Sequence, residues 1–189
     1  MSRLIVIAVL VLLTLAGCKP EAPAPAAPAA PATPAPVSRP QAAPKAAQPN
    51  IMFPSLRVTT LDGKAFDLAG QRGKWAIVNF WATWCGPCLK EMPELSALDA
   101  MREHIVVVGL AYEDTTEDAL RAFLVNHPVV YPMALVDVYN PPADFETPRG
   151  LPFTYLIGPD GAVVKMYTGP VSARMLEEDI AAAGGPKAD

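Results

Sequence analysis

Proline is distributed so unevenly along this chain of 189 residues that it separates a part that can fold from a part that cannot. Residues 19–50 contain ten prolines and twelve alanines among 32 residues. Proline fixes φ and removes a backbone donor, and alanine offers too little apolar surface to offset the entropy of ordering. We therefore expect an extended spacer of about 3.1 Å per residue there. The folded domain is predicted to occupy residues 51–185, a length sufficient for a single hydrophobic core.

The segment before the spacer has the features of an export signal. Arg3 is followed by an almost unbroken apolar run from Leu4 to Leu15. Such a run would span about 18 Å as a helix, less than the roughly 30 Å of a hydrocarbon core. A signal peptide at residues 1–17 is therefore favoured over a membrane-spanning helix. The signal ends in Leu-Ala-Gly directly before Cys18, which resembles the lipobox of bacterial lipoproteins.

That resemblance implies that the Cys18 thiol is lipidated and that residues 18–50 link the lipid to the domain. The alternative is an ordinary signal peptide followed by a spare cysteine. Lys19 stands where many inner-membrane lipoproteins have Asp, which leaves the inner and the outer membrane both open. Either membrane would hold the domain on the periplasmic side, where disulfides form and persist.

The charge balance and the cysteine count exclude several classes of function. The chain has 15 basic and 19 acidic residues and a net charge of −4. A nucleic-acid-binding protein or a polybasic membrane-surface protein needs a basic face, so we predict no nucleic-acid partner. Three cysteines and two distant histidines cannot complete a four-ligand zinc cage. We therefore expect no metal and no other cofactor.

Strand-like and helix-like segments alternate through the predicted domain. Strands are predicted at Leu56–Thr60, Ala65–Leu68, Trp75–Trp81, Ile105–Ala111, Met133–Val136, Thr154–Ile157 and Ala162–Tyr167. Helices are predicted from Cys85 to about His104, from Thr115 or Thr116 to Asn126, and from Ser172 to Gly184, with Met175, Leu176 and Ile180 facing inward in the last.

Turn signals and an apolar run indicate how these elements are arranged. Asp-Gly at residues 62–63 and Pro-Asp-Gly at residues 159–161 are typical of hairpin turns. The continuous apolar run Ile105–Ala111 is typical of a parallel strand covered on both faces. The pattern therefore predicts an α/β fold, in which a central mixed β-sheet is flanked by helices and preceded by an N-terminal β-hairpin.

The most informative residues are two cysteines, separated by Gly-Pro, at the point where a strand leads into a helix. Cys85 would lie at the helix N-terminus, where free N–H groups and the helix dipole lower the pKa of a thiol. Cys88 would lie one turn further along the same face, in position to resolve a mixed disulfide on Cys85. This arrangement predicts dithiol–disulfide exchange.

Structural, metal-binding and peroxidase roles suit the cysteine pair less well. A structural disulfide that closes four residues would stabilise the fold by only about 2 kcal/mol. A metal site lacks two ligands, and haem attachment requires histidine where Leu89 stands. A copper-delivery protein would have three residues between its cysteines and a later histidine in a suitable motif, whereas this chain has two residues between Cys85 and Cys88 and no such histidine. A thiol peroxidase would need a further cysteine in a loop of its own.

The segment from Trp84 to Cys88 resembles the thioredoxin superfamily and, more narrowly, the extracytoplasmic TlpA/ResA-like thiol–disulfide oxidoreductases. The resemblance covers nearly all of the predicted domain and implies a thioredoxin-like fold. Pro152 matches the cis-proline that faces the dithiol in this fold. Glu91 matches a glutamate that the membrane-tethered family carries three residues after its second cysteine. Asn79 stands where thioredoxin has a buried aspartate.

The resemblance also implies roles for individual residues. Glu91 would be a partly desolvated carboxyl that shuttles the proton of Cys88, the alternative being a solvated carboxylate on the helix surface. A cis turn would aim the backbone of Leu151 at a partner peptide. The substrate-binding residues are then Trp84, Gly86, Pro87, Leu151 and Pro152. Phe153 stands where the family usually has Thr or a small residue, and a bulky aromatic beside the groove would narrow the set of substrates. Trp81, Trp84 and Phe153 are expected to form an apolar rim, with ordinary core or shell packing as the alternative.

The dipeptide between the cysteines indicates the direction of the reaction. Gly-Pro is also the dipeptide of thioredoxin, whose potential is about −270 mV against about −120 mV for a strong oxidant. This favours a reductase of protein disulfides, which by resemblance include those of apocytochromes c and which would need a transmembrane thiol electron donor. An oxidase or isomerase of the same fold remains an alternative, as does a non-enzymatic lipoprotein that binds a metal or a partner.

Overall fold

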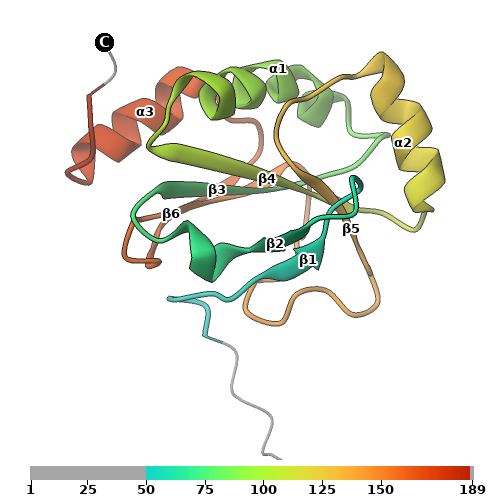
Figure 1. Ribbon diagram of the computed structural model, residues 1–189, viewed down its shortest axis with the longest axis horizontal. Coiled ribbons are helices and arrows are strands. Elements are labelled where there is room, and N and C mark those ends of the chain that lie inside the picture. Colours follow the sequence, from blue (N-terminus) through green and yellow to red (C-terminus); the bar gives the residue numbers. More distant parts are fainter. Residues whose placement is uncertain (1–49, 188–189) are drawn as a thin grey trace, which may run out of the picture. The chain divides into compact units, whose positions relative to one another are not determined.

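Figure 1 shows the computed structural model of the chain, in which residues 50–187 are described. The predicted signal peptide, Cys18 and the linker up to residue 49 lie outside the described residues. Within residues 50–187, the helices are all too short or too polar to cross a membrane.

The described residues form an α/β fold with one central sheet and one short hairpin. The strands are β1 (Arg57–Thr59), β2 (Ala65–Asp67), β3 (Trp75–Trp81), β4 (Ile105–Tyr112), β5 (Met133–Val136), β6 (Phe153–Ile157) and β7 (Val163–Thr168). The helices are the 3₁₀ helix η1 (Leu68–Gln71) and the α-helices α1 (Gly86–Met101), α2 (Glu117–Asn126) and α3 (Ala173–Ala182). The hairpin consists of β1 and β2, and the central sheet has the order β5-β4-β3-β6-β7.

The central sheet is mixed, as the sequence predicts. Strands β3, β4 and β5 are parallel, whereas β6 runs antiparallel to both β3 and β7. The register places Asn79 on β3 between Gly109 on β4 and Thr154 on β6. Phe80 is opposite Phe153, so the residue before β6, Pro152, lies beside the carboxyl end of β3.

Alternation along the strands separates two hydrophobic cores on opposite faces of the sheet. On β3, Ile77 and Trp81 point to the face that the helices cover, where the helices contribute Met92, Leu95, Leu98, Leu120, Leu176 and Ile180. Val78 and Phe80 point to the other face, where Leu56, Phe66 and Phe145 cover them. In Figure 1, α1 and α3 lie above the sheet and the β1–β2 hairpin lies below it.

Most of the predicted elements are confirmed, including both hairpins and the exact extent of the strand Trp75–Trp81. The turn glycines Gly63 and Gly161 adopt positive φ angles of 79° and 84°, which glycine populates without a Cβ clash. Strand β4 is covered on both faces, as its apolar run predicts.

Two predicted details are wrong. The first helix ends at Met101 rather than near His104, because the backbone of Arg102 is already extended (φ −120°, ψ 96°) and leads into β4 at Ile105. Met175 is 36% exposed instead of facing inward. Leu176 and Ile180 are four residues apart and share one face of α3, whereas Met175 is rotated by about 100° from Leu176 around the helix.

Candidate active site

The two cysteines of the motif lie where β3 ends and α1 begins, and they are joined by a disulfide with their Cα atoms 5.3 Å apart. Cys85 is the N-cap of α1, and its Sγ accepts a hydrogen bond of 3.3 Å from the backbone N–H of Cys88. In this disulfide form Cys85 is 4% exposed, whereas Cys88 is fully buried. Only Cys85 therefore presents surface to another molecule.

The neighbours of Cys85 in the motif surround it with exposed surface. Trp84 is 70% exposed, and Gly86 and Pro87 are also exposed. Pro87 occupies the first turn of α1, where its missing N–H group leaves no helical hydrogen bond unmade. The indole of Trp84 is thus a large apolar group that lies beside Cys85 without packing into the core.

The Leu151–Pro152 peptide bond is cis, as the resemblance implies. Leu151 is half-buried and packs against both cores, whereas Pro152 is buried. The carbonyl oxygen of Pro152 accepts a hydrogen bond of 2.9 Å from Gly169, which continues the pairing of β6 with β7. The β3–β6 register brings this turn to the end of the sheet at which Cys85 lies.

The expected apolar rim is wrong for Trp81 and Phe153, for which the alternative of core packing holds. Trp81 is completely buried on the helix face of the sheet, with its ring centroid 6.2 Å from that of Phe123. Phe153 packs edge-on against Tyr155 in the core on the opposite face. Because side chains alternate along β6, Thr154 rather than Phe153 points to the face that carries the cysteines. Trp84 alone remains at the surface.

Glu91 lies on α1, one turn beyond Cys88, and is only 2% exposed. Its Oε1 accepts a hydrogen bond of 2.8 Å from Asn79 Nδ2, and its Oε2 accepts one of 2.8 Å from the backbone N–H of Val171. Burial raises the pKa of Glu91 from its ordinary value to about 7, against the opposite effect of these two donors. The alternative of a solvated surface carboxylate is therefore wrong.

The sequence singles out Asn79, but neither its contact with Glu91 nor the participation of Thr154 was predicted from it. Asn79 and Thr154 are both fully buried, and Asn79 Nδ2 donates to Thr154 Oγ1 at 2.9 Å as well as to Glu91. An isolated Asn or Thr within an apolar strand is a usable signal for such a network. The Val171 contact carries no such signal, because a backbone N–H is common to almost every residue.

A second contact, not predicted from the sequence, holds the loop before Cys85. Glu113 follows β4 and accepts two hydrogen bonds from Thr83, one from its backbone N–H at 2.9 Å and one from its Oγ1 at 2.8 Å. Cys85 N–H in turn donates to the carbonyl oxygen of Ala82 at 3.1 Å. An acidic residue directly after a parallel strand would have been the signal, because the ends of β3 and β4 are adjacent.

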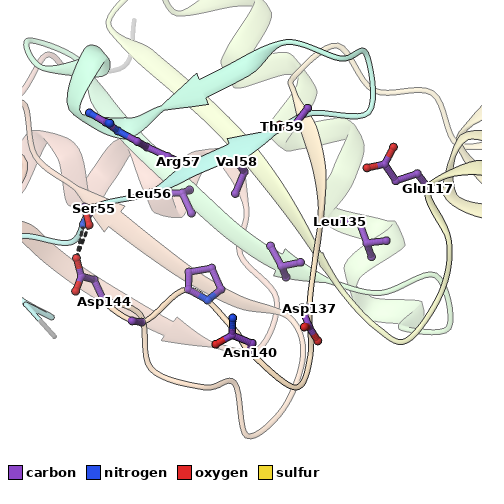
Figure 2. A pocket seen from close by; sticks show the side chains of 13 residues that line it. Ser55, Leu56, Arg57, Val58, Thr59, Glu117, Leu135, Asp137, Asn140 and Asp144 are labelled. Atoms are coloured by element: carbon purple, nitrogen blue, oxygen red, sulfur yellow. Dashed lines mark hydrogen bonds between the residues drawn. The ribbon is translucent and has the colours of Figure 1, made fainter. Parts of the chain in front are cut away.

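A separate groove of about 460 Å³ lies between β1, β5 and the loop that follows β5 (Figure 2). None of its lining residues belongs to the cysteine motif. Asp144, on the loop, accepts hydrogen bonds from the N–H and Oγ of Ser55, which bind the loop to the segment before β1. Within residues 50–187, His, Cys, Asp and Glu side chains do not gather in threes as a metal centre would require.

Comparisons with known proteins agree with this site. A family model described as AhpC/TSA matches residues 49–178. The thiol-disulfide oxidoreductase ResA of Bacillus cereus is 34% identical over 125 residues, which cover 66% of this chain and 72% of that protein.

Two solved structures are similar in fold and sequence. A protein of Chlorobium tepidum described as a putative thiol:disulfide interchange protein DsbE is 26% identical, with a TM-score of 0.61 over 74% of this chain and 99% of that one. A secreted disulfide oxidoreductase of Mycobacterium tuberculosis, homologous to E. coli DsbE, is 27% identical, with a TM-score of 0.57 over 67% and 95%. The chain belongs to the AhpC/TSA family of thioredoxin-like proteins and is a thiol–disulfide oxidoreductase of the ResA and DsbE type.

Proposed function

We propose that this chain is a membrane-tethered reductase of protein disulfides that works outside the cytoplasm. The asymmetry of the cysteine pair carries the proposal. Cys85 caps α1 and has the only exposed surface of the pair, whereas Cys88 is buried behind it. A cysteine that keeps a small accessible surface at a helix N-terminus suits the attacking thiolate, and a fully buried one suits the resolving thiol.

In the first step, the Cys85 thiolate attacks one sulfur of a disulfide in the partner protein. The partner's S–S bond breaks, its other sulfur leaves as a thiolate, and a mixed disulfide joins Cys85 to the partner. In the second step, Cys88 loses its proton and attacks Cys85. The mixed disulfide breaks and the partner's second sulfur leaves as a thiolate that takes up a proton. The Cys85–Cys88 pair is thereby oxidised by two electrons and the partner is reduced by two.

Glu91 is proposed to accept the Cys88 proton in the second step. Both groups are buried on α1 within one turn of each other, so the Glu91 carboxylate is a base shielded from solvent beside the Cys88 thiol. A pKa of about 7 leaves similar amounts of acid and base near neutral pH, which is the range in which a general base is most effective.

The surface around Cys85 is proposed to bind the partner. Trp84, Gly86 and Pro87 offer exposed, largely apolar surface next to Cys85 and Cys88 in the chain. The turn at Leu151 and Pro152, at the same end of the sheet, would present backbone groups for short strand-like pairing with an extended peptide. Recognition through the partner's backbone would allow several protein disulfides to be substrates, including those of apocytochromes c.

The direction and the location are supported by the sequence and by the relatives. Gly86 and Pro87 form the dipeptide of a strongly reducing protein, and a reductase in an oxidising compartment needs a transmembrane thiol electron donor. We propose that lipidated Cys18 and the Ala/Pro-rich linker tether the domain to a membrane on its periplasmic side. The resemblance to ResA and to a secreted oxidoreductase supports this location.

A trapping experiment in intact cells tests the function. The Cys88→Ser variant should accumulate mixed disulfides between Cys85 and its substrates, because the resolving thiol is missing. The matched Cys85→Ser variant should accumulate none. Absence of trapped partners in both variants would favour the non-enzymatic alternative. A reduction potential above about −150 mV, measured against glutathione, would replace the reductase with an oxidase or isomerase.

A further inference from the structure

The Glu91 carboxyl is held between two hydrogen-bond donors that come from different elements. The backbone N–H of Val171, ahead of α3, donates to Oε2, and Asn79 Nδ2, on β3, donates to Oε1, both at 2.8 Å. Both contacts suit a carboxylate, which only accepts hydrogen bonds. The proposed proton transfer from Cys88 makes Glu91 a neutral acid, for which this arrangement has to change.

The position of the added proton is decided by Val171. Its N–H group is part of the backbone and can only donate, so the oxygen that faces it, Oε2, remains the acceptor. The proton of the neutral acid therefore belongs on Oε1, which faces Asn79. With Asn79 Nδ2 in its present place, two donors would point at each other across 2.8 Å in a buried site. Such a clash costs the free energy of an unsatisfied buried donor, which weighs against the present orientation once Glu91 is neutral.

We propose that Asn79 is a positioning residue whose side-chain amide turns over when Glu91 takes up a proton, so that it donates to the carboxylate and accepts from the acid. The inference rests on the proposed function, in which Glu91 alternates between these two forms. An amide can serve both forms because its oxygen and nitrogen exchange places on a rotation by about 180°. An aspartate at this position would only accept once ionised.

Hydrogen bonds around Asn79 are equal in number in the two orientations. At present Nδ2 donates to Glu91 Oε1 and to Thr154 Oγ1, while Oδ1 is buried and accepts no hydrogen bond from any residue in 50–187. After the rotation, Oδ1 would accept from the Glu91 acid and from the Thr154 hydroxyl, which can donate as well as accept. The group without a partner changes from Oδ1 to Nδ2. Thr154 therefore supports either orientation.

Few ionisable groups face Glu91 besides the cysteines. Glu94, on the same helix, contributes to the raised pKa of Glu91. Tyr131, ahead of β5, is close enough to Glu91 that the Glu91 charge raises the pKa of the Tyr131 hydroxyl. The direct contacts from β3 and from the segment before α3 are the Asn79 amide and the Val171 N–H, neither of which ionises. A rotation of the Asn79 amide near neutral pH is therefore expected to follow the titration of Glu91.

The rotation can be followed by NMR on the full chain in its disulfide form, with Cys18→Ser to keep it in solution. At a pH above the Glu91 midpoint, the Asn79 side-chain amide protons should show a strong nuclear Overhauser effect to the Thr154 methyl group. Below the midpoint, this effect should weaken several-fold, with the same midpoint as the carboxyl carbon of Glu91. An effect of constant strength across the Glu91 titration would overturn the proposal.

Two variants make the test specific. In Glu91→Gln, the oxygen of the Gln side chain must face Val171 and its NH₂ group must face Asn79. The nuclear Overhauser effect between the Asn79 amide protons and the Thr154 methyl group is therefore expected to be weak at every pH. A strong effect in this variant would contradict the rotation.

Thr154→Val removes one hydrogen bond from each orientation of the Asn79 amide and should leave the midpoint of the Glu91 titration unchanged. A shift of about one pH unit or more would show that Thr154 supports only one orientation, which would overturn the balance on which the rotation depends. Failure of the proposed function would show instead as absence of trapped partners, which leaves these measurements readable.

Discussion

At the scale of single residues, Glu91 is an acidic group in a buried position that disfavours its ionised form. Desolvation raises its pKa from 4.5 to about 7, although Val171 and Asn79 both donate hydrogen bonds to it. The folded protein therefore holds a proton that the unfolded chain releases between these two pH values. The free energy of unfolding should fall as the pH rises through this interval, because ionisation of Glu91 is easier in the unfolded chain.

Replacing Glu91 with glutamine should remove this pH dependence. Between about pH 5 and about pH 8, the free energy of unfolding of the wild-type disulfide form should fall by up to about 3 kcal/mol relative to that of Glu91→Gln. Each unit of pKa difference between the folded and unfolded states corresponds to about 1.36 kcal/mol. Urea unfolding at both pH values measures the difference. The control is Glu103→Gln, which neutralises an exposed glutamate and should follow the wild type. Parallel stability curves for wild type and Glu91→Gln would show that Glu91 does not titrate in this range.

At the scale of elements, the ends of neighbouring strands assemble the site. The loop from Ala82 to Cys85 follows β3, Glu113 follows β4, and Pro152 precedes the antiparallel β6. Parallel strands bring their carboxyl ends to one edge of a sheet, and an antiparallel neighbour brings its amino end to the same edge. Residues far apart in sequence are thereby placed around one disulfide.

The contact between Glu113 and Thr83 predicts that β4 stabilises the loop that carries Cys85. Glu113→Ala removes the acceptor of two hydrogen bonds and should destabilise the protein by about 1–3 kcal/mol. Hydrogen exchange at the Thr83 amide should accelerate more than exchange in the centre of β3, because the loop opens locally. Glu103→Ala, at an exposed position, is the matched control. Unchanged exchange at Thr83 in Glu113→Ala would contradict a role for Glu113 in holding the loop.

The elements could be predicted from sequence more completely than the contacts between them. Trp75–Trp81 is apolar at all but one position, and Thr116 and Ser172 are strong N-cap residues, so strand β3 and the starts of α2 and α3 follow from local patterns. Phe153 could not be placed in this way, because its face depends on the register of β6. The bond between Val171 and Glu91 joins residues 80 positions apart and depends on how α3 packs against α1.

At the scale of the whole molecule, the described domain contains the reactive site, whereas the predicted signal peptide, Cys18 and linker would determine where the domain acts. The described domain is a self-contained sheet with a core on each face, and its site opens at one end of the sheet. The proposed lipid anchor at Cys18 would attach the domain to a membrane, and the proline-rich linker would determine how far from the membrane the domain reaches. Thirty-two residues at about 3.1 Å each would allow roughly 100 Å between the lipid and the domain. A tethered enzyme of this length would sample partners that lie within that distance of the membrane.

The proposed tether predicts that location and chemistry can be separated by one substitution. Cys18→Ser removes the thiol that would be acylated but leaves Cys85, Cys88 and the core untouched. The full chain should fractionate with membranes and incorporate a labelled fatty acid in bacterial cells, whereas Cys18→Ser should do neither. Both proteins should reduce a soluble model disulfide at equal rates, because the site is built within residues 50–187. A Cys18→Ser protein that still carries the label would show that another residue is the anchor. Equal rates together with poor reduction of partners in cells would show that the tether acts by raising the local concentration of enzyme near its substrates.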